Sequence, residues 1–133
     1  LRAATLLADA GIAAEVIDVR TLSPLDMPTI TASVAKTGRV VVTDTGWTNC
    51  GFAAEIVARL SEAAFADLKA PPRRVAMPDY PVPTSPALAN PLYPRAQDIA
   101  RAAQETLGLA PTIVAPPQTT PGDVPDPSFA GPF

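Results

Sequence analysis

The sequence predicts an α/β fold, a three-layer α/β/α sandwich around a mostly parallel sheet. Segments whose apolar residues recur every three or four positions alternate along the chain with short runs of β-branched residues. This alternation is typical of a parallel sheet that helices cover on both faces. The composition supports a buried core, because 47% of the 133 residues are hydrophobic and only 17% are charged. We therefore expect a globular domain of ordinary size.

The first elements are a helix and a strand. Residues 1–10 ("LRAATLLADA") are rich in alanine with apolar residues at helical spacing, and Gly11 ends the helix. Residues 13–20 ("AAEVIDVR") are predicted to form a buried strand. Because the chain starts inside a helix, we expect an N-terminally truncated fragment, with the first strand of the sheet ahead of Leu1.

The middle of the chain repeats this order. Asp26 is placed to cap a helix that ends at Gly38. Residues 39–45 ("RVVVTDT") form a second predicted strand. A longer helix starts at Phe52. The apolar face of the first of these helices carries Met27, Ile30 and Val34, and that of the second carries Phe52, Ile56, Leu60 and Ala63.

A third strand and a closing helix complete the predicted domain, which spans residues 1–109. Residues 72–79 form the strand, and residues 80–94 hold too many prolines for more than a single helical turn. The closing helix covers 95–108, with Ile99, Ala103 and Leu107 on its apolar stripe. Residues 110–133 contain seven of the 17 prolines and neither Lys nor Arg. They are predicted to be an extended tail that packs through Phe129 and Phe133.

Composition narrows the function classes. The net charge of −3 gives no general attraction to nucleic acid or to an anionic membrane surface. The apolar runs of the sequence are too short to span a bilayer. Cys50 is the single cysteine, and the chain has no histidine, so it lacks the residues of a common catalytic triad or a His-bearing zinc site. These features are consistent with a cytoplasmic protein, or with one of the mitochondrial matrix.

The segment "TDTGWTNCG" permits two interpretations. Asp44-Thr45-Gly46 matches the catalytic loop of aspartic proteases, but such an enzyme needs two aspartates on loops between β-strands. Here a helix follows instead. We therefore expect a strand-to-helix corner in which Asp44 orients a turn and Gly46 and Gly51 relieve backbone crowding.

We expect no catalytic, cofactor-binding or metal-binding residue in this chain, and we single out Arg20, Trp47, Asn49 and Glu55 as candidate interface or anion-contacting residues. Trp47 is expected to pack at an interface. The turn that contains Asn49 precedes a helix N-terminus, where free N–H groups can hold an anion. Arg20 either binds an anion or ties its strand end to a loop. Glu55 lies on the helix surface and can pair with Arg59.

Three segments together resemble the transketolase C-terminal domain family. They are "AEVIDVRTLSPLD" (14–26), "GRVVVTDTGWTNCGFAAEIVARL" (38–60) and "RRVAMPDYPVPTSPAL…YPRAQDI" (73–99), in the family's order and spacing. The resemblance is strongest to the E1 component beta subunit of thiamine-diphosphate-dependent 2-oxo acid dehydrogenases of the pyruvate, branched-chain or acetoin type. It covers residues 1 to about 109.

The resemblance implies a non-catalytic C-terminal domain of an enzyme that oxidatively decarboxylates a 2-oxo acid and transfers the acyl group to the lipoyl group of E2. Thiamine diphosphate and Mg²⁺ are then bound outside this chain, which is inactive alone. The implied partners are the E1 alpha subunit, a second beta subunit and the E2 core. Two alternatives are another thiamine-diphosphate enzyme, such as transketolase or deoxyxylulose-phosphate synthase, and a non-enzymatic assembly or binding module.

Overall fold

The structure, a computed structural model, describes residues 1–114. Its helices are α1 (Arg2–Asp9), α2 (Met27–Thr37), α3 (Phe52–Ala63), α4 (Pro86–Ala89) and α5 (Ala96–Thr106), with short 3-10 helices η1 (Phe65–Asp67) and η2 (Asn90–Leu92). Its strands are β1 (Val41–Trp47) and β2 (Arg73–Met77). The expected packing of Phe129 and Phe133 lies outside the described residues.

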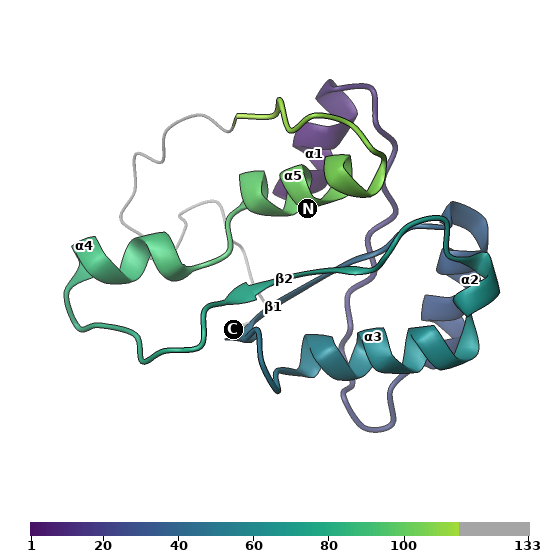
Figure 1. The fold of residues 1–133 in the computed structure, drawn as a ribbon, viewed down its shortest axis with the longest axis horizontal. Helices are drawn as coiled ribbons and strands as arrows, with labels where there is room; N and C mark the ends of the chain where they lie inside the picture. The colour runs from purple at the N-terminus through teal and green to yellow at the C-terminus, as the bar shows by residue number, and fades with distance from the viewer. Residues whose placement is uncertain (115–133) are drawn as a thin grey trace.

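The two strands form a parallel sheet between two layers of helices. Figure 1 shows α1 and α5 on one side of the sheet and α2 and α3 on the other. The register pairs Val41 with Arg73, Val42 with Arg74, Thr43 with Val75 and Trp47 with Met77, with an irregularity between Thr43 and Trp47. The predicted α/β fold with a parallel sheet is therefore confirmed.

The main core lies between α2, α3 and the sheet. Leu60 has no exposed surface and Val34 has almost none. Around them pack Leu25, Ile30, Ile56 and Ala64. Full burial of one such aliphatic side chain stabilises a fold by about 1.5–3 kcal/mol. The predicted stripes of these two helices are therefore largely correct, except that Ala64 takes the place of the exposed Ala63.

The limits of α2 follow from the residues at its ends. The Asp26 carboxylate accepts hydrogen bonds from the Thr29 hydroxyl (2.6 Å) and from the Thr29 N–H (3.2 Å), and this confirms the predicted N-cap. These bonds hold the pKa of Asp26 below its ordinary value. At the other end Gly38 has φ 72°, and its N–H donates to the Val34 carbonyl. A helix end of this left-handed form favours glycine.

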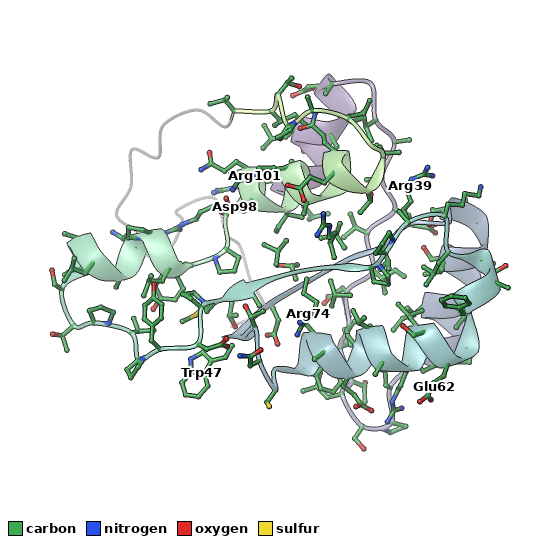
Figure 2. The ribbon with its side chains drawn as sticks, in the orientation of Figure 1. Arg39, Trp47, Glu62, Arg74, Asp98 and Arg101 are labelled. Carbon is green, nitrogen blue, oxygen red and sulfur yellow. The ribbon has the colours of Figure 1, made fainter. Side chains whose placement is uncertain are left out.

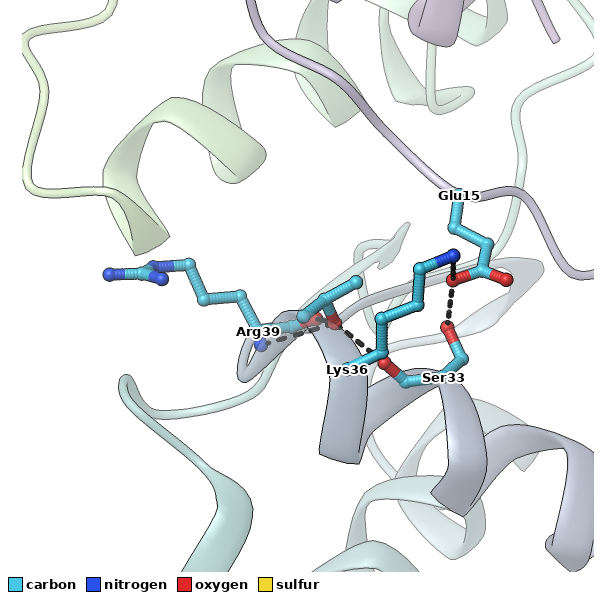
Figure 3. Close-up of polar contacts among 5 residues, drawn as sticks. Glu15, Ser33, Lys36 and Arg39 are labelled. Atoms are coloured by element: carbon cyan, nitrogen blue, oxygen red, sulfur yellow. Dashed lines mark hydrogen bonds and ion pairs between the residues drawn. The ribbon is translucent and has the colours of Figure 1, made fainter.

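Residues 13–20 are a correction to the prediction, because among residues 1–114 they pair with no strand. The segment is also not buried as predicted, although Ile17 and Val19 are partly buried and pack against the core. The segment is fastened by side chains instead of a backbone ladder. The Glu15 carboxylate accepts from the Ser33 hydroxyl (3.1 Å) and pairs with Lys36 (3.4 Å), as Figure 3 shows.

The closing helix is where predicted, but its predicted stripe is wrong. Leu107 is 36% exposed and Ile99 is only partly buried. The buried residues of α5 are Ala100, Ala102, Gln104 and Thr106. Three of these four residues are small, and α5 packs on both α1 and the sheet.

Candidate functional site at the carboxyl ends of the strands

The carboxyl ends of β1 and β2 lie at the same edge of the sheet because the strands are parallel. The segments that follow them are joined there. The N–H and hydroxyl of Thr48 both donate to the Met77 carbonyl (2.8 Å each), and the Asn49 N–H donates to the Asp79 carboxylate (2.7 Å). We call residues 47–51 and 77–80 the corner.

The sequence of the first corner segment explains its tight turn. A Cβ atom on Gly51 would lie 2.0 Å from the Trp47 carbonyl oxygen, so only glycine fits without a shift of the backbone. Cys50 has φ 57°, a left-handed conformation that is uncommon for a residue with a side chain. Gly51 then becomes the N-cap of α3. The predicted role of Gly51 is thus confirmed.

Asp44 orients this turn, as predicted. Its carboxylate accepts a hydrogen bond from the Gly46 N–H at 3.0 Å, two residues further on. A Cβ on Gly46 would lie 3.0 Å from the same carboxylate, so the pair is closely fitted. The strand that carries Asp44 runs into the corner and α3. The segment is therefore the strand-to-helix corner and not a protease loop between β-strands.

The corner presents aromatic side chains to solvent. Trp47 is 54% exposed and Tyr80 is 50% exposed. Arg74 of β2 bonds to the same corner, where its guanidinium donates a hydrogen bond to the Thr48 carbonyl. Figure 2 marks Trp47 and Arg74. Trp, Tyr and Arg are residue types that protein–protein interfaces favour.

Of the four residues that the sequence singles out, the structure brings two together. Trp47 and Asn49 belong to the corner, where Asn49 acts through its backbone N–H. Glu55 lies in the first turn of α3 and pairs with Arg59 at 2.7 Å, an exposed ion pair worth about 0.3–0.5 kcal/mol. Arg20 lies apart, on the extended segment before α2. It pairs with Asp18 of the same segment at 3.3 Å, with both side chains largely exposed, so it does not tie that segment to a loop.

Two corner residues, Asp79 and Tyr80, were missed from the sequence, and so was Arg74 of β2, which bonds to the corner. The sequence does contain a signal that could have located them. Tyr80 follows the predicted strand 72–79 just as residues 46–49 follow the predicted strand 39–45, and the ends of parallel strands share one edge. Applying this rule to both strands places Tyr80 beside Trp47.

A cavity of about 350 Å³ adjoins the corner, between β2 and the start of α5. Arg74, Tyr93 and Arg101 line it together with Asp98. Asp98 pairs with Arg101 and also accepts from the Arg95 N–H (3.0 Å), so it caps α5 while it balances one of the arginines. Within residues 1–114, no three His, Cys, Asp or Glu side chains are grouped to hold a metal ion.

The comparison with protein families matches residues 1–99 to the family described as "Transketolase, C-terminal domain". The chain belongs to this family. The matched region includes both strands, the corner and the start of α5.

Similar proteins narrow the resemblance to one kind of subunit. The chain is 48% identical over 107 residues to the "Acetoin:2,6-dichlorophenolindophenol oxidoreductase subunit beta" of Cupriavidus necator, covering 80% of this chain and 32% of the relative. It is 43% identical over 110 residues to the mitochondrial "Pyruvate dehydrogenase E1 component subunit beta" of Homo sapiens, covering 82% and 31%. It is 45% identical over 107 residues to the corresponding subunit of Bacillus subtilis, covering 80% and 33%. The chain thus spans about a third of the length of these relatives.

Within residues 1–114, no helix has both the length and the apolar character that crossing a membrane requires. The longest described helix, α3, has 12 residues, whereas a bilayer needs about 20.

Proposed function

We propose that this chain is the C-terminal domain of an E1 beta subunit in a thiamine-diphosphate-dependent 2-oxo acid dehydrogenase. The enzyme would oxidatively decarboxylate a 2-oxo acid such as pyruvate and pass the acyl group to the lipoyl group of E2. The support is the family match together with 43–48% identity to beta subunits of acetoin and pyruvate enzymes. These names favour the 2-oxo acid dehydrogenases over transketolase or deoxyxylulose-phosphate synthase.

In this proposal residues 1–109 form the domain and residues 110–133 its proline-rich tail, and the domain does no bond-making itself. The chain has no histidine and no Gly-Asp-Gly diphosphate motif. The described carboxylates are not grouped as Mg²⁺ would require, so we derive no cofactor step from these residues. Thiamine diphosphate and Mg²⁺ would be held by other parts of the enzyme.

The role of the domain is subunit assembly, and the corner is its contact surface. The observation that carries this role is the exposure of Trp47 on a backbone that is otherwise closely constrained. Gly51 fixes the turn below it, and hydrogen bonds from Thr48 and Asn49 fix the turn beside it. A rigid aromatic side chain loses little conformational entropy when a partner covers it, which favours its use as an interface anchor.

The partners in this assembly would be the E1 alpha subunit and a second beta subunit, with docking of the E2 core as a further role of the domain. The enzyme would be cytoplasmic, or would lie in the mitochondrial matrix if its source is eukaryotic. Among the relatives, the human subunit is mitochondrial by name.

The test is Trp47→Ala in the whole enzyme that contains this chain. If Trp47 is an interface anchor, its loss weakens assembly by about 2 kcal/mol or more, which is about thirtyfold in the dissociation constant. Sedimentation over a dilution series measures this change. Phe65→Ala is the matched control, because Phe65 is 74% exposed and follows the far end of α3 from the corner. Equal assembly of the Trp47 variant and the unmodified enzyme would refute the role.

A further inference from the structure

Gln104 is a buried polar residue that the proposed function does not use. It lies in α5 and is 3% exposed. Both the nitrogen and the oxygen of its side-chain amide make hydrogen bonds. The Nε2 group donates to the Thr112 hydroxyl (3.1 Å), and Oε1 accepts from the backbone N–H groups of Thr112 (3.2 Å) and Ile113 (3.3 Å). Burial of a primary amide is costly unless such bonds are made.

The partners of Gln104 lie on a segment that doubles back after α5. Gly108, with φ 71°, reverses the chain, and the Leu109 N–H donates to the Gln104 carbonyl at 3.0 Å. Figure 1 shows the chain returning along α5 from this point. We call residues 109–113 the strap.

The strap has little else to hold it in place. It contains neither helix nor strand, and residues 109–112 are exposed, with Leu109 showing 49% of its surface. Ile113 alone among residues 109–114 is partly buried. The hydrogen bonds that the structure describes for Thr112 and Ile113 all end on the side chain of Gln104.

The end of α5, on which the strap packs, is held in place by side chains from the sheet. The Arg39 guanidinium donates from Nε to the Thr106 carbonyl at 2.9 Å, and Arg73 pairs with Glu105 at 3.3 Å. Both arginines come from the sheet side of the helix, at or just before the start of a strand. Opening of the strap therefore need not move α5.

We propose that Gln104 is a latch that closes the strap onto α5 and so sets the point from which the chain continues beyond residue 114. The Gln104 oxygen accepts from backbone N–H groups, which every residue except proline provides. The contact therefore requires an extended chain but no particular sequence. When the strap opens, the Gln104 amide reaches water and exchanges its protein partners for solvent. The strap can thus open locally while the rest of the domain stays folded.

Amide hydrogen exchange, followed by NMR on the full chain, tests this latch. In the unmodified protein the Thr112 and Ile113 amides are expected to exchange more slowly than the Val114 amide. Gln104→Leu replaces the amide with an apolar side chain of similar size. Exchange at both amides should rise on the order of tenfold, because both lose their acceptor and the bond to the Thr112 hydroxyl is lost as well. The α5 amides should keep their rates.

Gln104→Glu separates hydrogen bonding from packing. A glutamate retains the oxygen that accepts from both amides, so slow exchange should return relative to Gln104→Leu. Fast exchange of Thr112 and Ile113 in the unmodified protein would overturn the proposal, and this measurement holds even if a variant fails to fold. Unchanged protection in Gln104→Leu would overturn it as well.

Discussion

The corner and the end of α5 are both places where the chain leaves regular structure, yet they are built in opposite ways. At the corner, the N–H groups of Thr48 and Asn49 and the Thr48 hydroxyl donate the hydrogen bonds, and the largest side chains, Trp47 and Tyr80, are half-exposed to solvent. At the end of α5 a polar side chain, Gln104, is buried, and its oxygen and nitrogen both have partners within the chain. The first region exposes its aromatic side chains, whereas the second encloses a polar side chain.

The difference indicates where a partner is required. An exposed tryptophan on a rigid turn gains free energy only when another surface covers it. A buried amide whose oxygen and nitrogen are both hydrogen-bonded within the chain has little to gain from a partner. We therefore place the assembly contact at the corner and an internal fastening at the end of α5. Three substitutions or conditions test this separation, in order of expected effect.

Leu60→Ala should have the largest effect, because it empties a site in the main core that has no exposed surface. We expect the free energy of unfolding to fall by about 2–5 kcal/mol, as measured by urea denaturation. The Asn49 amide should then exchange faster, while Thr112 and Ile113 keep their rates if the strap opens locally. Leu107→Ala is the control. Because Leu107 is 36% exposed, its truncation should lower the free energy of unfolding much less. Equal losses for the two leucines would show that the core is assigned wrongly.

Gly51→Ala should act on the corner alone. The new Cβ would lie 2.0 Å from the Trp47 carbonyl oxygen, so the turn must open. We expect a loss of about 1–3 kcal/mol in the free energy of unfolding, the usual cost of forcing atoms into a filled space. Faster exchange at Asn49 with unchanged exchange at Thr112 would sharpen the comparison. If the strap amides respond equally, the two regions are not independent.

The pH dependence of Asp26 should be the smallest effect, and it lies outside both regions. Hydrogen bonds from Thr29 lower the pKa of Asp26 below its ordinary value of 3.8. Its contribution to stability is therefore complete above that value and is lost as the pH falls through the lowered pKa. Asp26→Asn keeps an acceptor oxygen but does not titrate.

The measurement for Asp26 is urea denaturation of both proteins at about pH 6 and at about pH 3. The stability advantage of the unmodified protein over Asp26→Asn should shrink at the lower pH. Exchange at Asn49 and Thr112 should follow the same pH course in both proteins. An advantage that is the same at both pH values would contradict the assigned pKa shift.

Much of the fold was predictable because the signals are local. Asp26 and Gly38 mark the ends of α2, and the spacing of Ile56 and Leu60 marks the buried face of α3. The turn that Asp44 makes with Gly46 depends on residues two positions apart. Each of these features is decided by neighbours in sequence, so the pattern of residue types is sufficient to find it.

The errors concern contacts between distant residues. Residues 13–20 have the alternation of a strand, but a strand exists only where another backbone pairs with it, and their fastening is through Glu15 to α2. The predicted stripe of the closing helix passed through Ile99, Ala103 and Leu107 and did not include Gln104. Its burial depends on the strap, whose return along α5 no spacing in the helix reveals.

The sequence by itself determined the order and limits of the helices, the tight turn at residues 46–51, and a chain without histidine that resembles one enzyme family. Tertiary structure alone decided which side chains meet across the domain, with Trp47 left exposed beside Tyr80 and Gln104 enclosed by the strap. The physical reason is the separation along the chain over which each interaction acts. Caps, turns and periodic faces act within a few residues, whereas burial and hydrogen bonding between segments depend on how all the elements pack together.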